Sequence, residues 1–137
     1  MAGKNKKIGG GGFHHVFLKV SDLNRSIKFY TEALGFVEKV SWGEGAQRLV
    51  LLDTGDGNYF ELGQTSDKIS DGGSYPHVAF RTDNCDAALE SARSAGAVVT
   101  MEPKDIDLPA NPPFKVRIAF CKGPDGEILE FFQNELT

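Results

Sequence analysis

The sequence is poor in three features, and each shortage argues against a class of protein. It has only two cysteines, Cys85 and Cys121, which lie far apart and form no CxxC motif, so neither a disulfide-rich secreted domain nor a cysteine metal site is indicated. Its net charge of −4 argues against a nucleic-acid-binding surface. No apolar run approaches the roughly 18 residues of a membrane span. We therefore expect a cytoplasmic protein with reduced thiols, and no nucleic-acid or membrane partner.

What the sequence does contain is enough apolar material for a core. Apolar residues make up 40% of the 137 positions and include ten phenylalanines, which suits one domain that buries roughly two-thirds of its unfolded surface. The stretch MAGKNKKIGGGG has four consecutive glycines and no apolar segment typical of a secretory signal. We expect residues 1–12 to form a flexible lead-in and residues 13–137 to form a single domain.

The sequence contains an internal repeat. HVFLKV at 15–20 and HVAFRT at 77–82 each read as a strand, and each precedes a stretch with apolar residues at helical spacing. These two helical stretches, 22–36 and 83–97, both end on a glycine in the expected position.

Each half of the repeat then closes with two apolar strands around an Asp-Gly turn, at 49–62 and 118–131. The sequence thus predicts an α+β fold of two βαβββ modules, 13–63 and 75–133, joined by a linker at 64–74. A longer stretch, 102–113, is expected to interrupt the second module as a loop, either a lid or an irregular excursion.

Two histidines and two glutamates occupy matched places in this repeat. His15 and His77 stand at the start of the matched first strands, and Glu61 and Glu130 each lie four residues beyond a turn glycine. Side chains alternate along a strand, so His15 should share a face with Phe17 and Lys19, and turn away from the apolar set that packs on the helix. His14 should lie on the opposite face, where we expect a structural or solvent-exposed role.

These four side chains suggest a metal site. A single strand histidine or glutamate is more often structural or solvated than a ligand, but the matched placement of four favours a bound cation. Glu130 stands among apolar residues, and an unpaired buried carboxylate is costly. A set of nitrogen and oxygen donors favours a six-coordinate divalent ion with open positions, such as Ni²⁺ or Co²⁺, while Zn²⁺, Mn²⁺ and Fe²⁺ stay open.

The segments HVFLKVSDLNRSIKFYTEALGF, YFEL, YPHVAF and IAFCKGPDGEILEF resemble the glyoxalase I branch of the vicinal oxygen chelate superfamily, over nearly all of residues 13–133. The resemblance implies that the modules curl into a half-barrel with the helices outside. It also implies a divalent metal held in a homodimer, with His15 and Glu61 from one subunit and His77 and Glu130 from the other.

The resemblance further implies a lyase reaction on a small-molecule substrate. A glyoxalase I isomerises the hemithioacetal of glutathione and methylglyoxal to S-lactoylglutathione through an enediolate. Glu130 would be the catalytic base, with Glu61 sharing the proton transfer as an open alternative. Lys19, Arg81 and Arg117 are candidate contacts for the glutathione carboxylates, although the family often has arginine where this chain has Lys19.

Three alternatives remain open. The chain could be another metalloenzyme of the superfamily, namely an epimerase, a dioxygenase or a thiol transferase. The epimerase branch has a glutamine at the position that Glu61 holds here, which argues against an epimerase. The dioxygenases and thiol transferases use two histidines and one glutamate, so the fourth ligand argues against both. It could instead be a metal-free small-molecule-binding protein of the resistance type, or a structural dimeric domain whose acids pair with arginines.

Overall fold

A computed structural model describes residues 13, 15–69, 77–110 and 112–135. In it the chain forms two units that divide between Asp67 and Lys68, except that Glu32–Leu34 group with the second unit. The expected lead-in 1–12, His14 and residues 70–76 of the linker region lie outside the described residues. Among those described, no helix has the length and apolar character needed to cross a membrane. Each unit is described by itself below.

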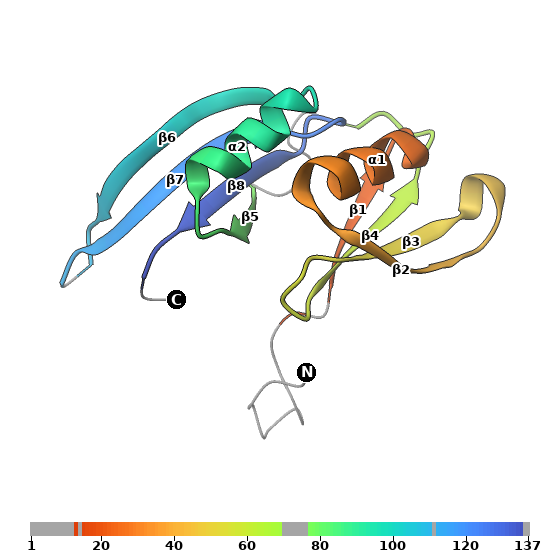
Figure 1. Cartoon of the computed structure of the whole chain (residues 1–137). Coiled ribbons are helices and arrows are strands. Elements are labelled where there is room, and N and C mark those ends of the chain that lie inside the picture. The colour runs from red at the N-terminus through yellow and green to blue at the C-terminus, as the bar shows by residue number, and fades with distance from the viewer. Residues whose placement is uncertain (1–12, 14, 70–76, 111, 136–137) are drawn as a thin grey trace, which may run out of the picture. The chain divides into compact units, whose positions relative to one another are not determined.

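The first unit is a four-stranded mixed sheet with one helix. Its strands are β1 (His15–Val20), β2 (Val37–Trp42), β3 (Leu49–Asp53) and β4 (Tyr59–Gln64), arranged in the order β1-β4-β3-β2 (Figure 1). β1 runs parallel to β4, whereas β2, β3 and β4 pair antiparallel. A short 3₁₀ turn, η1 (Gly45–Gln47), connects β2 to β3. The βαβββ order predicted for this half is confirmed.

Helix α1 (Leu23–Leu34) follows β1, and its ends are set by local sequence signals. The Asp22 carboxylate accepts the Arg25 N–H as an N-cap, and Gly35 ends the helix at a φ of 73° that suits glycine. Aromatic packing then joins the helix to the sheet. The Tyr30 ring lies 5.2 Å from Phe60 of β4 and is fully buried.

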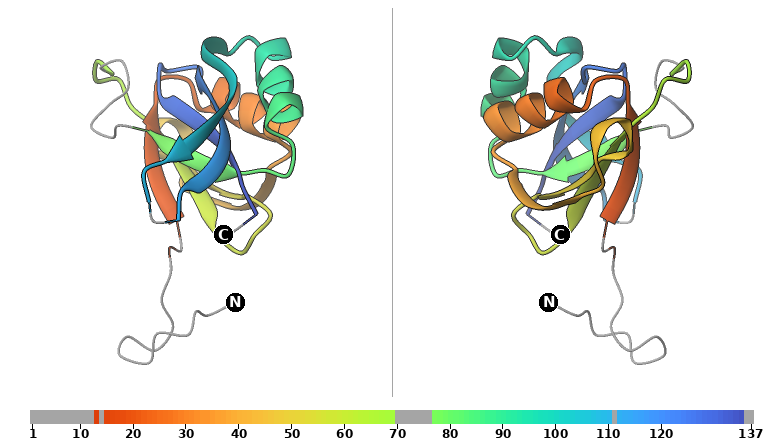
Figure 2. Two further views of the ribbon diagram at one scale, coloured as in Figure 1. Left: turned by 90° about the vertical axis from the view of Figure 1, so that its left-hand side faces the viewer. Right: turned by 90° about the vertical axis from the view of Figure 1, so that its right-hand side faces the viewer.

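The second unit repeats this plan with β5 (Val78–Arg81), α2 (Cys85–Ser94), β6 (Val98–Leu108), β7 (Phe114–Lys122) and β8 (Ile128–Gln133), in the sheet order β5-β8-β7-β6. β5 is parallel to β8, and the remaining pairs are antiparallel. Figures 1 and 2 show α2 lying along one face of this sheet. Two four-stranded mixed sheets, each with one helix, confirm the predicted α+β class.

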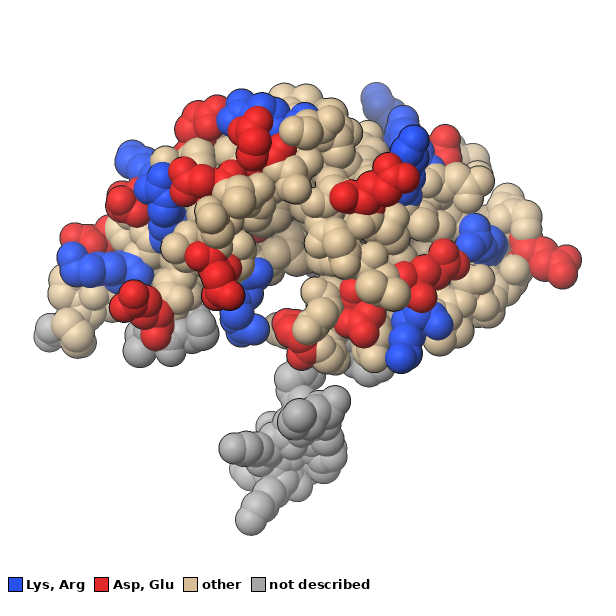
Figure 3. Space-filling model, in the orientation of Figure 1, with Lys and Arg blue, Asp and Glu red and all other residues tan. Residues whose placement is uncertain are grey.

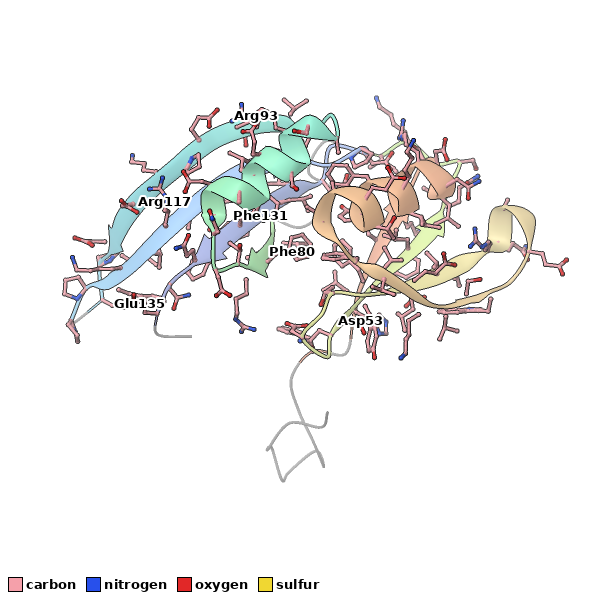
Figure 4. The ribbon with its side chains drawn as sticks, viewed as in Figure 1. Asp53, Phe80, Arg93, Arg117, Phe131 and Glu135 are labelled. Atoms are coloured by element: carbon pink, nitrogen blue, oxygen red, sulfur yellow. The ribbon has the colours of Figure 1, made fainter. Side chains whose placement is uncertain are left out.

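The core of the second unit lies between α2 and its sheet. Asn84 caps the helix by accepting the Ala87 N–H, and Leu89 on the helix is buried. Phe131 of β8 points toward α2 and lies 6.4 Å from the ring of Phe80 (Figure 4). Because strand residues alternate, this placement of Phe131 turns its neighbour Glu130 to the other face of the sheet.

The predicted loop at 102–113 is wrong over most of its length. β6 continues to Leu108 and pairs with β7, so that Asp105 lies opposite Arg117. Pro103 falls where the register shifts between Met101 and Lys104, and β6 is the edge strand of its sheet. A proline is tolerated at such an edge or bulge because it removes no hydrogen bond that the ladder needs.

Candidate functional site

Each unit brings together one histidine and one glutamate. In the first, His15 Nε2 lies 3.0 Å from Glu61 Oε2, and in the second, His77 Nε2 lies 3.0 Å from Glu130 Oε2. The parallel pairing of β1 with β4 and of β5 with β8 creates both contacts, because it aligns each first strand with the strand that carries the glutamate. The internal repeat of the sequence is therefore matched by a repeat of the same side-chain pair.

Both pairs lie on the sheet face opposite the helix. In β4 the buried Phe60 and Leu62 alternate with Tyr59 and Glu61, and in β8 the helix-facing Leu129 and Phe131 flank Glu130. The carboxylates are the more enclosed members of the pairs. The side chains of Glu61 and Glu130 are 13% and 8% exposed, whereas each imidazole is 41% exposed.

The environment of Glu130 affects its protonation. Burial raises the pKa of the Glu130 carboxyl above its ordinary value, and the neighbouring His77 imidazole opposes part of that rise. A desolvated carboxylate of this kind is a stronger base than one in water, and it gains more from a nearby positive charge.

One aromatic ring contacts the second pair. The ring of Phe120, on β7, lies 5.4 Å from the His77 imidazole at an interplanar angle of 84°. Strand pairing also places Phe120 directly opposite Glu130. In the first unit the residue opposite Glu61 on β3 is Leu51. The two pairs therefore differ in the side chains that support them.

No group of three or more histidine, cysteine, aspartate or glutamate side chains gathers in the part of the chain that the structure describes. Each unit by itself offers two donors, one imidazole nitrogen and one carboxylate. The four-ligand set of His15, Glu61, His77 and Glu130 stays a prediction, and within each unit the structure brings its two members together.

The three predicted substrate contacts fall on different faces. Lys19 lies four residues after His15 on β1, and Arg81 lies four residues after His77 at the end of β5. Residues four apart on a strand share a face, so both cations lie on the faces that carry the histidine–glutamate pairs. Lys19 and Arg81 are also matched in the repeat.

Arg117 has a different position. Arg117 shares one face of β7 with Ala119 and Cys121, because these residues are two apart on the strand. Ala119 pairs with Phe131, so Arg117 lies on the face covered by α2. Its guanidinium donates to both carboxylate oxygens of Asp86, at 2.7 and 2.8 Å, and to Asp105 at 3.1 Å. These partners raise the pKa of Arg117 further, and the Arg117 contact lowers that of Asp86. The placement argues against the substrate role predicted for Arg117.

Sequence reasoning missed two glutamines that support the site-bearing strands. Gln64 Oε1 accepts the backbone N–H of Leu23, the first residue of α1, at 3.1 Å. Gln133 Oε1 accepts the corresponding N–H of Cys85, the first residue of α2, at 2.8 Å. The sequence signal is the spacing Glu-x-x-Gln, which occurs at 61–64 and again at 130–133.

Charged side chains of both signs are interspersed over the molecular face shown in Figure 3. Several form pairs, such as Arg93 with Glu90 and Glu102. The contact with Glu102 joins α2 to β6. Exposed pairs of this kind add little stability individually.

Comparison with known proteins places the chain in a family. The model of the Glyoxalase/Bleomycin resistance protein/Dioxygenase superfamily matches residues 12–131. A lactoylglutathione lyase from Haemophilus influenzae is 34% identical over 130 residues, which are 90% of this chain and 93% of that protein. A lactoylglutathione lyase from Escherichia coli O157:H7 is 32% identical over 128 residues, with 88% and 91% covered. The crystal structure of glyoxalase I from Zea mays is similar with a TM-score of 0.72 and 27% identity, and the match covers 88% of this chain but only 45% of the maize chain.

Proposed function

This chain belongs to the glyoxalase/bleomycin resistance protein/dioxygenase superfamily, and we propose that it is a metal-dependent lyase of the glyoxalase I type. Its substrate would be the hemithioacetal of glutathione and methylglyoxal, and its product S-lactoylglutathione. The observation that carries this proposal is the pair of matched histidine–glutamate contacts at 3.0 Å. The relatives named lactoylglutathione lyase support the choice of reaction.

The donor set suits a divalent cation. The two carboxylates supply two negative charges, which balance a doubly charged ion. Together with the two neutral imidazole nitrogens they make four ligands and leave two positions open in a six-coordinate sphere. We propose that His15 and Glu61 of one subunit combine with His77 and Glu130 of a second subunit in a homodimer. Ni²⁺ or Co²⁺ fits this set best. A cation held there would act as a Lewis acid toward the substrate oxygens.

The chain's own residues would move the proton. The reaction removes a proton from one carbon of the hemithioacetal and returns it to the adjacent carbon, with an enediolate between the two transfers. Glu130 is the proposed base because its burial raises the pKa of the carboxyl and makes it a better proton acceptor. The 3.0 Å contact between His77 Nε2 and Glu130 Oε2 brings the two proposed ligands to the same place, where a bound cation would hold both. Glu61, in the matched pair, could share the proton transfer.

Lys19 and Arg81 are the proposed contacts for the substrate's carboxylates. Four residues of strand span about 13 Å, so each cation would lie about that far along the strand from its histidine. This separation suits a tripeptide thiol whose charged ends lie away from its reacting sulfur. Arg81 can bind a carboxylate with two parallel hydrogen bonds, whereas Lys19 offers a single point charge.

We further propose a cytoplasmic location, where glutathione is abundant as the free thiol. The two cysteines, Cys85 and Cys121, are buried and form no disulfide, which suits a reducing compartment.

A subunit-mixing experiment tests the shared site. His15→Ala and His77→Ala are each expected to lose both sites of the homodimer. In a heterodimer of the two variants, one site would contain both substitutions and the other neither. The heterodimer, isolated with two different affinity tags, should therefore recover one metal ion and about half of the wild-type activity, as two-fold symmetry requires.

The possible results separate the parts of the proposal. Recovery of metal and activity supports ligands shared between chains. A wild type that binds metal while the heterodimer stays inactive would show that the ligands come from one chain. A wild-type protein with neither bound divalent metal nor isomerase activity toward the glutathione hemithioacetal would overturn the proposed function.

A further inference from the structure

We infer that Phe120 is a positioning residue, which holds the His77 imidazole in the orientation that the proposed metal site needs. This inference rests on the proposed function, because it takes His77 and Glu130 as ligands. It adds a residue that is not itself a ligand. It also means that the His77–Glu130 pair is held by a different kind of neighbour than the His15–Glu61 pair.

The strand register brings Phe120 to both members of the second pair. Phe120 on β7 lies opposite Glu130 on β8, and directly opposite residues on neighbouring strands project to the same face. Its ring also contacts the His77 imidazole in a T-shaped arrangement, with centroids 5.4 Å apart. A single side chain thus contacts the histidine and lies beside the glutamate.

His77 needs such a support because of its place in the fold. It lies just before β5, at the edge of its sheet, and its side chain is 41% exposed. An imidazole in that position can rotate about two side-chain bonds, and fixing it costs conformational entropy. Glu130 contacts one ring nitrogen, Nε2, while the Phe120 ring lies against the imidazole itself. Together they restrict both rotations.

The first unit places its aromatic residue on a different strand. The residue matched to Phe120 is Leu51, opposite Glu61, and the aromatic neighbour of Glu61 is Phe17 on β1. The Phe17 ring extends toward Gly63. A side chain at position 63 would place its Cβ atom only 3.0 Å from Phe17 Cζ. In the second unit the position matched to Phe17 is Ala79, opposite Glu130. The ring contact to His77 therefore comes from β7.

The strength of an aromatic pair sets the size of the expected effect. Loss of one edge-to-face contact changes the equilibrium between orientations of the imidazole ring by about two- to tenfold. Metal binding requires the imidazole in one orientation, so loss of the ring should weaken binding by this factor. The Phe120→Leu variant installs the residue found at the matched position of the first unit, which keeps the strand apolar and limits damage to the fold.

Three variants and two measurements test the inference. Phe120→Leu removes the ring, Phe120→Tyr keeps it, and Phe114→Leu makes the same substitution on the same face of β7, where the ring packs 6.0 Å from Phe132 instead. The first measurement is the dissociation constant for Ni²⁺, determined by competition with a chelator. The second is the NMR signal of the His77 ring in metal-free protein with ¹³C-labelled histidine, assigned with His77→Ala.

We expect Phe120→Leu to raise the Ni²⁺ dissociation constant by about two- to tenfold and to shift the His77 ring signal. Phe120→Tyr and Phe114→Leu should stay near the wild type in both. An unchanged dissociation constant in Phe120→Leu, or an equal loss in Phe114→Leu, would overturn the inference and leave the proposed function intact. A wild type that binds no divalent cation would instead overturn the proposed function, and an unshifted His77 signal would then refute the ring contact independently.

Discussion

Gln133, the last residue of β8, accepts the backbone N–H of Cys85 through its side-chain Oε1 at a distance of 2.8 Å. Cys85 begins α2, and the first N–H groups of a helix have no partner within the helix. Gln64 makes the same contact with Leu23 at the start of α1. In both units a glutamine thus ties the end of the glutamate-bearing strand to the start of the helix.

We predict that Gln133→Ala lowers the free energy of unfolding by about 1–2 kcal/mol, because it leaves the partly buried Cys85 N–H without its partner. Urea denaturation measures the change. Gln133→Glu, which keeps an acceptor at the same place, should recover much of the loss. Gln47→Ala serves as the control, since Gln47 is exposed in η1. Equal urea midpoints for Gln133→Ala and the wild type would contradict the prediction.

The predictions that held depend on signals within a few residues. Each Asp-Gly turn reverses the chain between two strands, and Gly35 ends α1 at a φ of 73°. Period-two alternation correctly separated His15 from the helix-facing Val16 and Val20, as the burial of β1 shows. Such signals are local, so the sequence alone carries them.

The features that the sequence did not predict depend on distant partners. Residues 102–108 belong to β6 because β7 lies beside them and pairs with them, whereas the sequence alone was interpreted as a loop over 102–113. In the sequence Arg117 looks like an ordinary strand cation, and only the packing of α2 on the sheet brings Asp86 to 2.7 Å from it. The Glu-x-x-Gln spacing was visible, but only the parallel pairing of first and last strands shows what the glutamines reach.

The candidate site lies between these two cases. The repeat singled out two histidines and two glutamates as candidate ligands, and strand parity predicted the faces on which they lie. It could not give the 3.0 Å contact within each pair, since that distance depends on the register of strands more than 40 residues apart. The joining of the two pairs into one site stays a prediction.

We predict that Glu130→Gln lowers kcat toward the glutathione hemithioacetal by about 10²- to 10⁴-fold, the usual contribution of a general base. The amide keeps the shape of the side chain but cannot accept the proton. Steady-state kinetics measures the loss, and the metal content of the same sample shows whether the amide has also released the cation. Glu61→Gln should cost less in kcat if Glu130 is the main base.

Two control variants accompany this prediction. Glu102→Gln changes an exposed glutamate that bonds to Arg93, and it should leave kcat unchanged. His14→Ala is expected from strand parity to do the same. A larger loss of kcat in Glu61→Gln than in Glu130→Gln would reverse the assignment of the base.

The Asp86–Arg117 contact should make stability depend on acid pH. The Arg117 guanidinium lowers the pKa of Asp86 in the folded protein, so between the folded and unfolded pKa values the unfolded chain binds more protons. The stabilisation is thus present above the unfolded pKa and is lost as the pH falls through the folded pKa.

The urea midpoint of Asp86→Asn, followed from pH 7 to pH 2, tests this effect. The gap between wild type and variant should be widest near neutral pH and should shrink below about pH 4. Asp107→Asn, which removes an exposed carboxylate from β6, is the control. A gap of constant width over the whole range would show that the carboxylate contributes no charge-dependent stability.

The buried thiols should be inert until the protein unfolds. Burial, with a smaller effect from Glu127, raises the pKa of Cys121 to about 11, and burial also raises that of Cys85. At pH 8 only about one Cys121 thiol in a thousand would be ionised, and the thiolate is the reactive form. Mass spectrometry after iodoacetamide treatment should therefore find no modified cysteine in the native protein and two in urea. Ser94→Cys adds a thiol at an exposed position of α2, and this control should be modified once under native conditions. Rapid modification of Cys121 in the native wild-type protein would contradict its burial.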